Sequence, residues 1–378
     1  MIGKIIQSTT TIFVGKENNM IHVARPNIDD QEVNAAIEVL KSGNYTSGSI
    51  NGKFEEEFAK YCDTDFAASC NSGTAAIHMV LLALGIGPGD EVIVPSISFF
   101  ATVSPILMVG AEPVFCDVEL YGNMSANSAE TYITEKTKAI IPVHLHGRPC
   151  NMTEIMQLAR RYNLFVIEDC AQAHGAEFQN RKVGSFGDAG CFSFFATKNM
   201  TTIEGGMVTT NNPRIDEMCR LYRSHGMINR DEHAVLGYNY RLNELSAAIG
   251  RIQLKKLDDF NKKRRENSLT IYNMVKKESL KFPRVQPIYN HVYFWCPVYT
   301  EAAWVMDMLK SHLKRNGIGF RSRYSVPMYK QPIFKNKYYN VKNRVAETFC
   351  KNVIGMPNHP GITKDELDKV ISVMEAFN

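Results

Sequence analysis

Several features that would place this chain in a special class of protein are missing from its sequence. The longest apolar run, at 75–84, contains His78 and falls short of the roughly 18 residues that a membrane span requires. The net charge of +4 is small for 378 residues. The one dense basic cluster, at 262–265, sits in a helical pattern and is typical of a solvated helix face. These absences argue against a membrane protein and against a nucleic-acid partner.

Paired cysteines are also missing. The nine cysteines are an odd number, they are widely spaced, and no two of them form a C-x-x-C pair. Cys70, Cys116 and Cys191 sit inside apolar, strand-like runs, where a reduced core cysteine is the usual role. The N-terminus has no signal-peptide apolar core. We therefore predict a cytoplasmic protein in a reducing setting.

The composition, with 44% apolar and 22% charged residues, is that of a soluble globular protein long enough for two domains. Residues 1–19 read as a polar N-terminal extension with a short β-prone piece at 9–14, and regular patterning begins near Met20. We predict a large domain over 20–262 and a smaller C-terminal α+β domain over 263–378.

Strand-like and helix-like segments alternate along the large domain. Short apolar runs typical of buried strands occur at 66–70, 91–95, 113–117, 139–144, 164–168, 190–194 and 207–210. Helical patterns lie between most of them, at 74–84, 99–109, 128–133 and 152–162. This alternation predicts an α/β fold with a mainly parallel sheet and helices on both faces.

Further helices are expected on either side of this alternation. Asp29, with Glu32 three residues on, looks like the capped start of a helix with an apolar stripe at Val33, Ile37 and Leu40. A Gly/Ser/Asn loop at 42–52 leads into a second, amphipathic helix. The remaining expected elements are a long connecting helix at 242–275, a strand at 292–298, and helices at 304–316 and 364–376.

The first group of residues with chemical potential is Asn71-Ser72-Gly73-Thr74, between a predicted strand and an apolar helix. Glycine lets backbone come close to a ligand, and a helix N-terminus offers free N–H groups and the positive end of its dipole. Ser72 and Thr74 add hydroxyl donors. An anion site and a plain N-cap followed by a turn glycine are equally compatible with this pattern.

The second group is Glu168 and Asp169, at the carboxyl end of the strand predicted at 164–168. Neighbouring strand positions point to opposite faces, so only one of the two carboxylates is expected to face a site. Its partner would be a protonated pyridine nitrogen or an ordinary arginine. His174 has no second histidine at metal spacing, so we predict a hydrogen-bonded structural residue and no metal site.

The third and fourth groups are aromatic and basic. Either Phe99 or Phe100 could stack on a planar ring, although a core position for both is the commoner outcome. Lys198 follows the strand predicted at 190–194. Loss of solvent at this junction would lower its basicity and let the amine hold a carbonyl compound as a Schiff base, whereas the alternative is a solvated loop lysine.

Together these groups indicate one ligand. The cradle, the aromatic ring, the carboxylate and the lysine each come at the carboxyl end of a successive strand, which is the edge where open parallel sheets bind ligands. A phosphorylated pyridine aldehyde needs its phosphate anchored, its ring covered, its ring nitrogen kept protonated and its aldehyde held.

Longer stretches strengthen this interpretation, at 71–76, 87–92, 168–172, 192–198, 204–207 and 237–241. In their order and content they resemble the sugar aminotransferases of the DegT/DnrJ/EryC1/StrS group, which are fold-type-I enzymes that use pyridoxal 5'-phosphate. The resemblance runs from about Met20 to the C-terminus.

The resemblance implies roles for individual residues. Lys198 resembles the lysine that forms the Schiff base with the cofactor and moves protons between cofactor and substrate. Asp169 resembles the partner of the pyridinium nitrogen, and Gln172 the residue that faces the phenolic oxygen of the ring. Phe99 occupies the ring-stacking position.

The phosphate contacts are implied in the same way. The positions at which the family binds the phosphate correspond to Gly73, Thr74 and Ser193. We expect the Ser72 hydroxyl to bind the cofactor as well. Asn239 would reach the phosphate from the neighbouring subunit, because family members are homodimers with shared active sites.

The implied activity is a transamination in two halves. L-Glutamate gives up its amino group and leaves as 2-oxoglutarate, and a nucleotide-linked 4-keto-6-deoxyhexose then receives the nitrogen at C4. The T-T-x-E-G-G-M pattern after Lys198 resembles perosamine synthases, although Ile203 stands where those members usually have glycine. Substrate contacts are expected from 42–52, 144–148 and 321–330.

Three alternatives stay open. The first is amination of another keto sugar or of a cyclitol. The second is a pyridoxal phosphate-dependent sugar 3-dehydratase, although that branch of the family carries histidine in place of Lys198. The third is a regulatory protein that binds pyridoxal phosphate without catalysis.

Overall fold

The computed structural model describes residues 20–46, 48–284, 286–335 and 337–377. The predicted N-terminal extension, with its β-prone piece at 9–14, lies outside the described residues. Over the described ranges, no helix is both long and apolar enough to cross a membrane.

A seven-stranded sheet forms the centre of the molecule, with strand order β1-β9-β8-β5-β4-β2-β3. Its strands are β1 (Phe66–Cys70), β2 (Glu91–Pro95), β3 (Glu112–Cys116), β4 (Thr137–Ile140), β5 (Phe165–Asp169), β8 (Ala189–Ser193) and β9 (Gly206–Thr210). Neighbours pair in parallel except β9, which is antiparallel to both β1 and β8. The predicted mainly parallel sheet is therefore confirmed.

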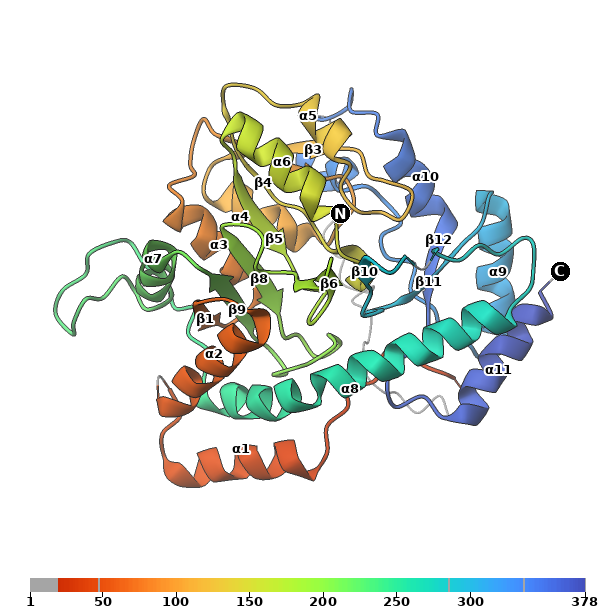
Figure 1. The fold of residues 1–378 in the computed structure, drawn as a ribbon, viewed down its shortest axis with the longest axis horizontal. Helices are drawn as coiled ribbons and strands as arrows, with labels where there is room; N and C mark the ends of the chain where they lie inside the picture. The colour runs from red at the N-terminus through yellow and green to blue at the C-terminus, as the bar shows by residue number, and fades with distance from the viewer. Residues whose placement is uncertain (1–19, 47, 285, 336, 378) are drawn as a thin grey trace, which may run out of the picture.

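Helices cover both faces of this sheet (Figure 1). They are α2 (Ser49–Cys62), α3 (Gly73–Ala83), α4 (Ser104–Met108), α5 (Ala126–Glu130), α6 (Met152–Tyr162), α7 (Pro213–Arg223) and the start of α8 (Glu244–Met274). Val92 and Val94 join the core beneath α3, α4 and α7, whereas Ile93 between them joins the core beneath α5 and α6. The strands read as continuous apolar runs because alternate side chains enter two cores.

The long helix α8 runs from beneath the sheet to a C-terminal cluster (Figure 1). That cluster combines the last turns of α8 with β11 (Cys296–Tyr299), β12 (Val353–Met356), α9 (Ala303–Arg315) and α11 (Lys364–Glu375). Met328 and Tyr329 instead pack into the core of the large sheet. The predicted boundary at 262 falls inside α8, and the division into two domains stays a prediction.

The helix α1 (Asp30–Ser42) begins at the predicted capping box of Asp29 and Glu32, but its buried face differs from the predicted one. Val33, Ile37 and Leu40 are 47%, 39% and 55% exposed. Glu32 is buried instead, because its carboxylate accepts hydrogen bonds from Lys256 Nζ (2.9 Å) and Gln253 Nε2 (2.8 Å) on α8. The predicted apolar stripe therefore lies on the outside of the described chain.

Other predicted boundaries were also wrong: the helix predicted at 128–133 is α5, the strand predicted at 139–144 ends with β4 at Ile140, and the strand predicted at 292–298 begins with β11 at Cys296. The segment 99–109 is divided into a short 3-10 turn, η3 (Phe100–Thr102), and α4. Pro105 lies in the first turn of α4 and lacks the N–H that a continuous helix would need there. The loop predicted at 42–52 is shorter, since α2 begins at Ser49.

Two glycine-to-alanine substitutions should change stability in opposite directions. A Cβ on Gly250 in α8 would lie 2.7 Å from Phe54 Cζ and 2.8 Å from Thr202 Cγ2, whereas nothing lies within 4 Å of one on Gly52 in α2. We expect Gly250→Ala to lower the free energy of unfolding by about 1–3 kcal/mol through overpacking. We expect Gly52→Ala to raise it by about 0.5–1 kcal/mol. Urea unfolding of both variants measures this, and equal gains in both would contradict the close contact of α8 with α2.

Candidate active site

A cavity of about 370 Å³ opens at the carboxyl edge of the sheet, beyond the ends of β1, β2, β5 and β8. Eight of the nine predicted cofactor-binding residues line it, although they are spread over more than 120 positions of the sequence: Ser72, Gly73, Thr74, Phe99, Asp169, Gln172, Ser193 and Lys198. The parallel strands bring them together because their carboxyl ends share one edge. The functional roles of these residues stay predictions.

The N-terminus of α3 forms one wall of the cavity. Ser72 is its N-cap, and the Ser72 hydroxyl oxygen accepts the backbone N–H of Ala75 (3.1 Å). The first turn carries no carboxylate, and the first N–H groups of any α-helix have no intrahelical partner. A Cβ on Gly73 would lie only 2.8 Å from Ser193 Cβ. The turn is therefore both an N-cap and a backbone cradle suited to an anion.

Asp169 is held rigidly at the end of β5. Its Oδ2 accepts the Thr102 hydroxyl (2.7 Å), which also lies 2.7 Å from the Ser98 hydroxyl, and its Oδ1 accepts the N–H of Ala171 (3.1 Å). This hydrogen-bonded set spans the ends of β2 and β5 and leaves the carboxylate on the cavity wall. A cationic ring nitrogen is the type of partner that a carboxylate so placed can bind.

Lys198 lies half-buried in the loop between β8 and β9, where burial lowers the pKa of its amine to about 8. The charges of Arg321 and Arg323 lower this pKa further, and the charge of Asp169 opposes them. The Lys198 Nζ lies 5.0 Å from the centre of the Phe294 ring. The interpretation as a solvated loop lysine was therefore wrong, and a neutral, nucleophilic amine is accessible near neutral pH.

The loop that carries Lys198 is closed by hydrogen bonds at both ends. Phe194 donates its N–H to Gly205 O (2.8 Å), and the N–H of Thr202 donates to Phe194 O (3.0 Å). Ile203 follows, with a φ of 72° and 58% exposure. This left-handed conformation is disfavoured for a β-branched residue, whereas glycine adopts it without a steric penalty. The hydrogen bonds of Phe194 with Thr202 and Gly205 hold the turn although Ile203, and not a glycine, occupies this position.

Phe99 and Phe100 occupy different environments. Phe100 packs against Phe334, with ring centres 5.8 Å apart, in the core of the large sheet. Phe99 is 53% exposed and lines the cavity. Of the two, Phe99 is the ring available for stacking on a ligand.

Asn239 is the one predicted cofactor-binding residue that does not line the cavity. Its backbone oxygen accepts a hydrogen bond from the Asn71 amide (3.3 Å), which places it on the rim of the α3 cradle. Its role from a neighbouring subunit stays a prediction.

Six cavity residues that follow Lys198 were not assigned a role from the sequence, and Phe294 and Trp295 are two of them. Arg321, Arg323 and Tyr324 come from the expected substrate stretch 321–330, and Glu204 follows Ile203. The sequence feature that could have indicated their role is the pair of arginines at 321 and 323, separated by the single residue Ser322. The other expected substrate stretches, 42–52 and 144–148, contribute nothing to the lining of this cavity.

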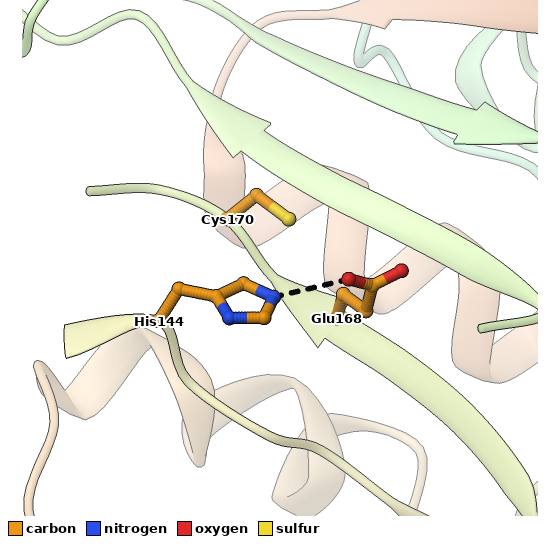
Figure 2. Close-up of side chains that lie close together, drawn as sticks. All are labelled: His144, Glu168 and Cys170. Carbon is orange, nitrogen blue, oxygen red and sulfur yellow. Dashed lines mark hydrogen bonds and ion pairs between the residues drawn. The ribbon is translucent and has the colours of Figure 1, made fainter. Parts of the chain in front are cut away.

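Glu168 does not line the cavity and lies beside His144 and Cys170 instead (Figure 2). Its Oε2 accepts His144 Nε2–H (3.0 Å) and the N–H of Gly184 (2.9 Å), and its Oε1 accepts two more backbone N–H groups. The other ring nitrogen of His144 accepts the N–H of Cys150 (3.0 Å). Because hydrogen bonds occupy the Glu168 carboxylate and both His144 nitrogens, this cluster is explained as structural support rather than a metal site.

His174 corrects one prediction. Its ring is buried between Phe192 and Phe194, with ring centres 5.6 Å and 5.7 Å away. Neither ring nitrogen has a hydrogen-bond partner among the described residues, and burial lowers its pKa to about 3. His174 is structural, as predicted, but as a packed aromatic ring rather than through a hydrogen bond.

Comparison with known proteins identifies the class of this protein. Its structure is similar to the pyridoxal phosphate form of the protein Spr1654 from Streptococcus pneumoniae, with a TM-score of 0.88 and 26% identity over 95% of this chain and 98% of that one. The cradle, the carboxylate and the lysine described above fit that cofactor. The protein is a pyridoxal phosphate-dependent aminotransferase of fold type I.

Sequence comparison then gives its family. The model of the DegT/DnrJ/EryC1/StrS aminotransferase family matches residues 26–375, and the chain belongs to this family. It is 38% identical to a GDP-perosamine synthase of Escherichia coli O157:H7, over 95% of this chain and 98% of that protein. It is also 38% identical to a UDP-N-acetyl-3-dehydro-alpha-D-glucosamine 3-aminotransferase of Acidithiobacillus ferrooxidans, over 89% and 91%.

The lowered pKa of Lys198 predicts how the free protein reacts with pyridoxal phosphate. Only the neutral amine attacks an aldehyde, so covalent capture by borohydride should rise as pH increases through about 8. For an ordinary lysine, the same rise in labelling would occur only near pH 10.4. Peptide mass spectrometry should locate the label on Lys198, and Lys198→Arg should abolish it. Labelling that the variant leaves unchanged would contradict the assignment.

The hydrogen bonds of Glu168 predict that even a conservative substitution at this position strongly destabilises the protein. Glu168→Gln places an amide nitrogen against N–H donors and should lower the free energy of unfolding by about 3 kcal/mol. The control is Glu57→Gln, which removes a partly exposed pair with Arg251 and should cost less than about 1 kcal/mol. Thermal unfolding with and without a chelator measures both. A chelator that destabilised the wild type would instead indicate a bound metal ion at this cluster.

Proposed function

We propose that this protein transfers the amino group of L-glutamate to C4 of a nucleotide-linked 4-keto-6-deoxyhexose. The products are 2-oxoglutarate and a 4-amino sugar for polysaccharide biosynthesis. The observation that carries the proposal is the Lys198 amine, with its pKa lowered to about 8, in the same cavity as Asp169 and the α3 cradle. The GDP-perosamine synthase relative and the pattern that follows Lys198 support the choice of C4.

Each group of residues in the cavity has a separate role in the proposed reaction. Pyridoxal phosphate, when bound, supplies the electron sink for breaking and forming bonds at the amino-bearing carbon. The α3 N-terminus and Ser193 hold the phosphate, Asp169 keeps the ring nitrogen protonated, and Phe99 covers the ring. Lys198 takes and returns a proton in both halves, for which an amine with a pKa near the working pH is suited.

Two arginines support an acidic amino donor. Arg321 and Arg323 line the cavity, and neither forms an ion pair with a carboxylate among the described residues. Burial and the charge of Arg323 lower the pKa of Arg321, as expected for neighbouring cations in a confined space. A guanidinium binds a carboxylate through two parallel hydrogen bonds. L-Glutamate brings two carboxylates to this excess of positive charge.

A second copy of the chain is proposed to complete the site. Asn239 lies on the rim of the cradle without lining the cavity of its own chain. The exposed stripe of Val33, Ile37 and Leu40 supplies an apolar surface that association would bury. All nine cysteines are buried and unpaired, in keeping with our proposal of a reducing, cytoplasmic setting.

A panel of substrates tests the proposed function. We expect L-glutamate alone to yield 2-oxoglutarate in a single turnover, and a 4-keto-6-deoxyhexose linked to GDP, UDP or dTDP to accept the nitrogen afterwards. Lys198→Ala should abolish both halves, because no other amine replaces the proton carrier, whereas Lys263→Ala on the exposed surface of α8 should match the wild type. Coupled assays for 2-oxoglutarate and mass spectrometry of the sugar measure the two halves.

The same panel separates the alternatives. Nitrogen at C3, or turnover only with other keto sugars or cyclitols, would replace the proposed substrate. A 3-deoxy sugar with release of ammonia would indicate a dehydratase. Cofactor binding without conversion of glutamate would indicate a regulatory protein.

A further inference from the structure

The carboxamide of Gln172 is held at both ends. Its Oε1 accepts the backbone N–H of His146 (3.0 Å), and its Nε2 donates to the Tyr324 hydroxyl (3.1 Å). A backbone N–H can only donate, so the amide oxygen must face His146 and the amide nitrogen must face Tyr324. One N–H of Gln172 remains for the cavity that the residue lines.

Tyr324 reaches this position from 152 residues further along the chain. It follows the bridge between Arg321 and Gly355, and its ring lies 6.1 Å from that of Trp295. Because its oxygen accepts from Gln172, its own O–H is directed elsewhere. No acceptor for this O–H occurs among the described residues, and both Tyr324 and Trp295 line the cavity.

We propose that Tyr324 is a positioning residue that fixes the Gln172 amide and adds a second donor at the place of the phenolic oxygen of the bound cofactor. This inference rests on the proposed function, because it assigns the cavity to pyridoxal phosphate. Two donors aimed at one oxygen favour its anionic form over its neutral form. Tyr324 thereby sets the pH at which the bound cofactor changes its protonation state.

The surroundings of Tyr324 suit a donor. Burial raises its pKa, the charge of Asp169 raises it further, and the charges of Arg321 and Arg323 oppose this rise. The phenol therefore keeps its proton at neutral pH. Behind Gln172, burial lowers the pKa of His146 to about 3, so this ring is uncharged. Lys198 and Glu204 are the other titratable groups on the cavity.

The test compares two tyrosines of one segment. Tyr324→Phe removes the hydroxyl on the cavity without changing the charge. Tyr329→Phe removes one that donates to Glu347 Oε1 (2.8 Å), outside the lining of the cavity. Each protein is loaded with pyridoxal phosphate, and the visible absorbance of the cofactor is titrated. We expect the midpoint to rise by about one pH unit in Tyr324→Phe and to stay unchanged in Tyr329→Phe.

A second variant tests whether Tyr324 acts through Gln172. Gln172→Met should raise the midpoint as well, and adding Tyr324→Phe to it should give less than the sum of the two separate shifts. Circular dichroism confirms that each variant is folded. If Tyr324→Phe does not fold, Tyr324→Leu, which removes the same hydroxyl, carries the test with the same expected rise of the midpoint.

The outcomes are distinguishable. Identical midpoints in wild type and Tyr324→Phe would overturn both roles of Tyr324, and fully additive shifts would overturn its action through Gln172. Either result would leave the proposed function intact. A wild type that develops no visible band with pyridoxal phosphate would instead remove the proposed function.

Discussion

The end of β5 determines how the active site is built. Glu168 and Asp169 are adjacent, so they face opposite sides of the sheet. Glu168 is locked on one side by His144 and by three backbone N–H groups of the 184–187 turn. A slip of one residue would turn each side chain to the opposite face, so that Asp169 would lie on the side of these donors. The hydrogen bonds behind the strand therefore decide which carboxylate reaches the cofactor site.

The electrostatics of the cavity follow from this arrangement. Burial takes water from the Lys198 amine, and two nearby guanidinium groups add to the cost of its charge, while the Asp169 carboxylate offsets part of it. The result is an amine that exchanges its proton near neutral pH. The same guanidinium groups form no ion pair with a carboxylate among the described residues, so the feature that lowers the pKa of the lysine also leaves unpaired positive charge on the cavity wall.

Much of the fold and site could be predicted from local pattern. The bounds of β1, β2 and α6 agree with the predicted segments, because each is a complete apolar or amphipathic unit between turn residues. The prediction of the buried face of α1 was wrong, because contacts with distant residues decide it. Lys256 and Gln253 bury Glu32, and Val33 is left exposed. His174 likewise has no hydrogen bond because two phenylalanine rings surround it.

By itself the sequence determined the order of strands and helices, and with it the groups at the strand ends: Thr74, Phe99, Asp169 and Lys198. Parallel strands place their carboxyl ends at one edge, so knowing the strands was enough to bring these groups together. The stretch 321–330 was expected to contact substrate, but so were 42–52 and 144–148, and only the tertiary structure decided that Arg321, Arg323 and Tyr324 close this cavity while the other two stretches do not line it. These three residues belong to a segment without strong periodicity, and its position depends on packing against the large sheet and pairing with Gly355. Such contacts are non-local and leave no pattern in the neighbouring residues.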